Sequence, residues 1–107
     1  MNTFEKGQIK ILVYRDDAEA VWYATALELN LTIDGDDKNS VILELDRAIT
    51  EYVDSARVIG SVSLLNQSPD PELLALWQAK ISSVSEDAGI SSPYTIHLAA
   101  TESLVYG

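Results

Sequence analysis

The chain has 107 residues, a formal net charge of −10 and no cysteine, and 47% of its residues are hydrophobic. This length fits one domain, and the composition is typical of a folded chain rather than a disordered one. Seventeen acidic residues against seven basic ones argue against binding a phosphate backbone or an anionic membrane surface, because both need clustered Lys and Arg.

The first third of the chain predicts three strands. In residues 8–15 and 21–26, successive side chains fall on opposite faces with a period of two, which is typical of half-buried strands. The connection between them, residues 16–20, is short and acidic, so the two strands are expected to form an antiparallel hairpin. Residues 29–34 alternate in the same way and predict a third strand, which ends at a turn at Gly35.

A long amphipathic helix is predicted over residues 38–56, because apolar residues recur there at spacings of three and four. Either Asp36 or Asp37 can cap its N-terminus. Gly60 is the expected stop, since glycine commonly follows the last turn of a helix.

The rest of the chain predicts one more helix and a candidate fourth strand. Asp70 directly before Pro71 is a typical helix start, and the helix is expected over about 71–84. Residues 94–98 alternate and form the candidate strand.

The predicted architecture is a single α+β domain over residues 1–107, with its core in residues 8–60. It has a three-stranded antiparallel sheet, with a fourth strand as an option, and a long helix on one face. The element order is strand, strand, strand, helix, helix, strand.

Within this pattern, the acidic turn 16–19 stands directly before the aromatic and small residues 21–24, and the third strand ends at the acidic turn 34–36 before the helix. In these features residues 16–56 resemble the HicB-like group, the antitoxin half of a bacterial toxin–antitoxin pair, and its stand-alone relatives. The resemblance implies a partial RNase-H-like or ferredoxin-like domain, which often forms dimers or higher oligomers.

In the complete antitoxins of that group, this domain covers a small basic RNA-cleaving toxin and a separate C-terminal segment binds the operator. Two features of this chain depart from that pattern. Leu29-Asn30 stands where a Pro-Gly turn is usual, and the only cation of residues 61–107 is Lys80. A stand-alone relative that makes no direct contact with nucleic acid is therefore the closer match.

Candidate chemistry is sparse, so the sequence predicts no enzyme, cofactor or metal site. His97 is the only histidine, which excludes a His-paired nucleophile within one chain, and its alternation with Ile96 predicts a solvent-facing side chain. The acidic run 34–37 does not continue as an EF-hand, because Asn39 replaces the required Gly and Leu45 the required Glu. A turn and a helix cap explain that run without a metal.

A metal-dependent nuclease is a second alternative, raised by the RNase-H-like label. That chemistry needs several carboxylates converging on two metal ions. Nothing in the spacing brings Asp16 and Asp17 to the acidic residues that follow the third strand.

The expected function is a non-catalytic interaction module that docks or neutralises a basic partner protein in the cytoplasm, since no apolar leader precedes residue 8. Carboxylates would steer the partner, and two aromatic residues would anchor it. The expected partner-binding residues are Asp16, Asp17, Glu19, Trp22, Tyr23, Asp34, Asp36 and Asp37. The alternative is a structural domain that associates only with itself as a homo-oligomer.

One question stays open at this level: what covers the second face of the sheet. Leu12, Tyr14, Val21 and Tyr23 would form an apolar patch there. The second helix or another subunit could cover it.

Overall fold

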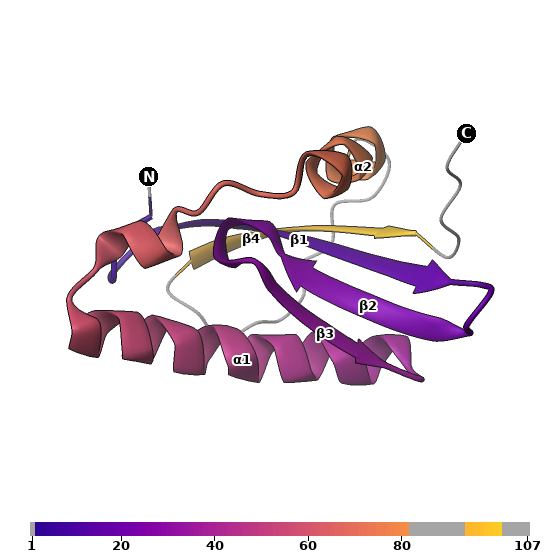
Figure 1. Ribbon diagram of the computed structural model, residues 1–107, viewed down its shortest axis with the longest axis horizontal. Helices are drawn as coiled ribbons and strands as arrows, with labels where there is room; N and C mark the ends of the chain where they lie inside the picture. The colour runs from indigo at the N-terminus through magenta and orange to yellow at the C-terminus, as the bar shows by residue number, and fades with distance from the viewer. Residues whose placement is uncertain (1, 82–93, 102–107) are drawn as a thin grey trace.

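The computed structural model describes residues 2–81 and 94–101 and shows an α+β arrangement of four strands and two helices (Figure 1). The elements in chain order are β1 (Gly7–Asp16), β2 (Val21–Ala26), the 3₁₀ turn η1 (Leu27–Leu29), β3 (Leu31–Gly35), α1 (Lys38–Ile59), the 3₁₀ turn η2 (Val62–Leu65), α2 (Pro71–Ile81) and β4 (Tyr94–Thr101). The predicted α+β class is confirmed.

The four strands form one sheet in the order β3-β2-β1-β4. β2 is antiparallel to both β1 and β3, whereas β4 runs parallel to β1. The first three strands are antiparallel to their neighbours as predicted, and the fourth strand, whose direction the sequence left open, makes the sheet mixed. Parallel neighbours need a long crossover connection, and here the crossover contains both helices.

The third strand begins two residues later than predicted. Leu27–Leu29 forms a 3₁₀ turn, which Asn30 ends in the left-handed conformation with φ 51°. Asparagine tolerates that region better than most residues. This turn stands where the resemblance implies Pro-Gly.

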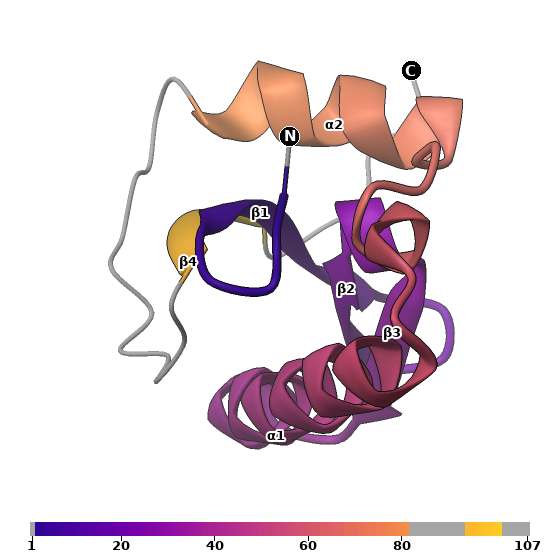
Figure 2. The same cartoon turned by 90° about the vertical axis from the view of Figure 1, so that its left-hand side faces the viewer.

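α1 lies along one face of the sheet and closes the main core (Figure 2). Its buried residues are Val41, Leu45, Ile49, Val53 and Ala56. They meet Ile9, Ile11, Val13, Ala24 and Ala26 of the first two strands in one hydrophobic cluster. Burying each larger aliphatic side chain contributes about 1.5–3 kcal/mol to folding.

Both ends of α1 carry the expected signals. The Asp37 side chain accepts from the Ser40 backbone N–H at 2.9 Å, so Asp37, not Asp36, is the cap. Gly60 takes a positive φ of 78° and donates its N–H to the Ala56 carbonyl at 2.8 Å. The helix extends three residues beyond the predicted 38–56.

α2 crosses the opposite face of the sheet, packing mainly on β4 and β1 (Figure 2). The Trp77 indole N–H donates to the His97 carbonyl at 2.9 Å. Leu12 and Ala99 are fully buried on this face, so the second helix covers part of the second face of the sheet. Residues 82–84 of the predicted helix lie outside the described residues.

No helix in residues 2–81, the described stretch that holds both helices, is long and apolar enough to cross a membrane.

Candidate functional site

The strand register brings the predicted carboxylates to one end of the sheet. Asp16 of β1 pairs with Val21 of β2, and Trp22 of β2 pairs with Gly35 of β3. The turn after β1 and the junction between β3 and α1 therefore lie at the same end of the molecule (Figure 1). We call this surface the acidic end; it consists of Asp16, Asp17, Glu19, Asp34, Asp36 and Asp37.

Three of these carboxylates have local structural roles. Asp16 accepts from the backbone N–H of Ala18 at 3.0 Å, within its own turn. Asp17 pairs with the guanidinium of Arg15 at 2.5 Å, an exposed contact that contributes little to stability. Asp37 caps α1.

The other three, Glu19, Asp34 and Asp36, are exposed and cap no helix. In the described ranges 2–81 and 94–101, no three His, Cys, Asp or Glu residues are placed to hold a metal ion. The acidic end thus concentrates negative charge without forming such a group among the described residues.

Tyr23 is the aromatic residue that faces this charge. Its ring stacks on that of Tyr14, with centroids 5.2 Å apart and an interplanar angle of 21°. Burial is the largest cause that raises the pKa of Tyr23 above 10.0; the nearby charges of Glu19, Asp16 and Asp34 and a hydrogen bond with Glu19 raise it further. The phenol is therefore held in its neutral form.

Trp22, the other predicted anchor, points to the opposite face of β2. It is half-buried and packs against the core beneath α1. Successive side chains of a strand alternate between faces, so one partner surface cannot lie flat on both aromatic rings. Of the two predicted anchors, only Tyr23 shares its face of the sheet with Asp34.

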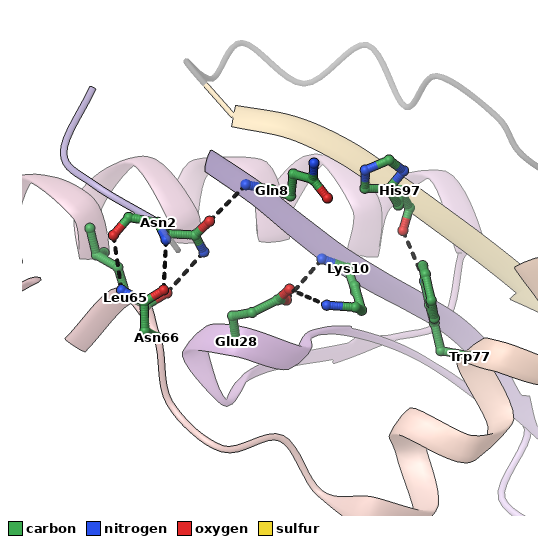
Figure 3. A network of polar contacts seen from close by, with 8 residues as sticks. All are labelled: Asn2, Gln8, Lys10, Glu28, Leu65, Asn66, Trp77 and His97. Atoms are coloured by element: carbon green, nitrogen blue, oxygen red, sulfur yellow. Dashed lines mark hydrogen bonds and ion pairs between the residues drawn. The ribbon is translucent and has the colours of Figure 1, made fainter. Parts of the chain in front are cut away.

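A second feature, a polar cleft of about 610 Å³, lies toward the opposite end of β1 (Figure 3). Its lining residues are Asn2, Lys6, Gly7, Gln8, Lys10, Glu28 and Asn66. Sequence reasoning missed this cleft, because its residues come from three distant parts of the chain.

The cleft exists because β2 is shorter than β1. The last paired residue of β2 is Ala26, opposite Ile11, so the start of β1 has no strand on that side. Side chains take its place: Asn2 Oδ1 accepts from the Gln8 N–H at 2.7 Å, and Glu28 Oε1 accepts from the Lys10 N–H at 2.9 Å.

Glu28 also forms an ion pair with the Lys10 ammonium at 2.8 Å. The same side chain therefore satisfies both a backbone donor and a charge, which protects an otherwise open strand edge. Asn2 is held in turn, because its amide N donates to the Leu65 carbonyl at 2.9 Å. The polar groups of the cleft largely bind one another, which indicates a structural role.

His97 lies beside Lys10 in the parallel register, on the face that α2 covers. The prediction of a solvent-facing side chain is wrong: Nε2 is buried, with no hydrogen-bond partner among the described residues. Trp77 of α2 lies over this part of the sheet, with its ring centroid 5.7 Å from the Lys10 ammonium. The burial of His97 could not be predicted from the sequence, because the sequence predicts the second helix but not which strands it packs against.

Comparison with known proteins adds no relative to this picture. No family model, no curated protein and no solved structure matches the chain. The HicB-like resemblance therefore depends on the residues quoted from 16–56.

Proposed function

We propose that this chain is a non-catalytic protein-interaction module of the HicB-like type, which docks a basic partner protein at the acidic end. One observation carries the proposal: the strand register brings six carboxylates, from the β1–β2 hairpin end and from the β3–α1 junction, to one end of the molecule. The element order and the long helix on one face of the sheet also support a partial RNase-H-like domain.

The charge of the surface suits a basic partner. A chain of net charge −10 repels other acidic proteins and attracts basic ones, and clustered charge speeds the encounter. Exposed charges interact over about 8 Å at physiological ionic strength, so carboxylates that share one end act together. Binding should therefore weaken as salt is added.

The backbone next to this surface offers a second kind of contact. β3 is an outer strand of the sheet, and it leads directly into the acidic end. An outer strand presents N–H and C=O groups that can pair with a strand of another protein. Charge would bring the partner to this edge, and strand pairing would hold it there.

The test is capture of a partner from the native host with the purified chain as bait. The bait is compared with a variant that carries Glu19→Gln, Asp34→Asn and Asp36→Asn, which removes three charges without removing the helix cap. We expect the wild-type bait to retain a basic protein and the variant to lose it by at least about tenfold, as for two or more close charge pairs.

A matched control removes the same number of charges elsewhere, through Glu5→Gln, Glu51→Gln and Asp54→Asn. All three positions are exposed and lie in the N-terminal loop or the second half of α1. The control bait should retain the partner. Equal retention by all three baits, or recovery of no basic protein, would contradict the proposal.

A further inference from the structure

A cross-strand row of three side chains stands on the face of the sheet that bears α2. Tyr14 pairs with Tyr23 across β1 and β2, and Tyr23 pairs with Asp34 across β2 and β3. The sheet order places β2 between the other two strands. Since Tyr14 stacks on one face of the Tyr23 ring, the other face lies on the side of Asp34.

The space above Asp34 borders solvent. β3 is an outer strand, and both Thr32 and Asp34, which point to this side, are exposed. α2 packs mainly on β4 and β1, toward the other side of the sheet. Aspartate is also short, so a flat group could rest over it and against the Tyr23 ring at the same time.

We propose that this row selects arginine over lysine in the basic partner: a guanidinium stacks on the side of the Tyr23 ring away from Tyr14 and pairs with the Asp34 carboxylate. A guanidinium is planar, stacks on aromatic rings and offers paired N–H donors to a carboxylate. An ammonium is a compact, strongly hydrated charge without a flat face, so it stacks less well on the ring and cannot offer a carboxylate two parallel donors from one plane.

The surrounding charge fits this occupant. Asp16 and Glu19 lie close enough to Tyr23 to favour its neutral form, so the same carboxylates add to the attraction of a cation. The inference rests on the proposed function, because it names which side chain of the basic partner the acidic end recognises.

The test measures binding of two short peptides, one of alternating arginine and glycine and one of alternating lysine and glycine, by fluorescence anisotropy at low salt. The wild-type chain should bind the arginine peptide about fivefold more tightly, the value of one moderate cation–π contact. Tyr23→Leu should abolish this preference, and Tyr23→Phe should keep it, because the ring remains. Circular dichroism verifies that both variants fold.

Asp34→Asn and Asp36→Asn give a matched pair that leaves the ring in place. Asp34→Asn should reduce the arginine preference, whereas Asp36→Asn should weaken both peptides equally. If the wild type binds both peptides equally, and both lose affinity when the acidic end is neutralised, the arginine inference fails and the proposed function stands. If neither peptide binds, both fail.

Discussion

At the scale of single residues, the sequence identifies which side chains are acidic or aromatic but not which of them meet. Tyr23 reads as one of several strand aromatics, and only the register places it between Tyr14 and Asp34. Lys10 and Glu28 are eighteen positions apart and share a hydrogen bond and an ion pair that no local pattern predicts. The one signal in the sequence for a partner of Lys10 is its place on a strand face that otherwise carries Leu12 and Tyr14.

Tyr23 gives the residue-scale prediction. Because its pKa is raised in the folded chain, the folded state holds the phenol proton more tightly than the unfolded state does. This contribution to stability is complete below about pH 10 and is lost as the pH rises from there through the folded pKa. Ultraviolet titration should show one late phenolate, absent in Tyr23→Phe, and Asp34→Asn should bring it to lower pH. A late phenolate that persists in Tyr23→Phe would belong to another tyrosine.

At the scale of elements, a strong periodic pattern in the sequence is sufficient to predict that an element exists and whether it is a helix or a strand. The predicted 38–56 helix is present because its apolar face is continuous, and Gly60 marks its end. The last turn was missed because Val58 and Ile59 are exposed, at 88% and 69%, and so add nothing to an apolar stripe. The parallel pairing of β4 with β1 could not be predicted, since it depends on a crossover of two helices rather than on any local signal.

The cap of α1 gives the element-scale prediction. The sequence left Asp36 and Asp37 as alternatives, and the structure assigns the hydrogen bond with the Ser40 N–H to Asp37. Asp37→Ala should lower the free energy of unfolding by about 1 kcal/mol, the usual cost of a lost N-cap. Asp36→Ala should change it by less than about 0.5 kcal/mol, as for an ordinary surface substitution. Urea denaturation measures both, and equal effects would argue that Asp36 shares the cap.

At the scale of the whole molecule, the two polar regions differ in how their groups are satisfied. In the cleft, Asn2 and Glu28 close the open part of β1, and donors meet acceptors. At the acidic end, like charges lie together with a few local bonds among them. Charge that repels itself costs stability, and it is the arrangement expected of a surface kept for binding rather than for folding.

This contrast predicts opposite effects of one variant on stability and on binding. Glu19→Gln, Asp34→Asn and Asp36→Asn together should leave the free energy of unfolding unchanged or raise it by up to about 1 kcal/mol, because repulsion is relieved and the helix cap is kept. The gain should be largest at low salt, where screening is weakest. The same variant should lose the basic partner. Urea denaturation at low and high sodium chloride concentration measures the first effect. A variant clearly less stable than the wild type at both would mean that these carboxylates hold the fold together, and the case for a surface maintained for docking would fail with it.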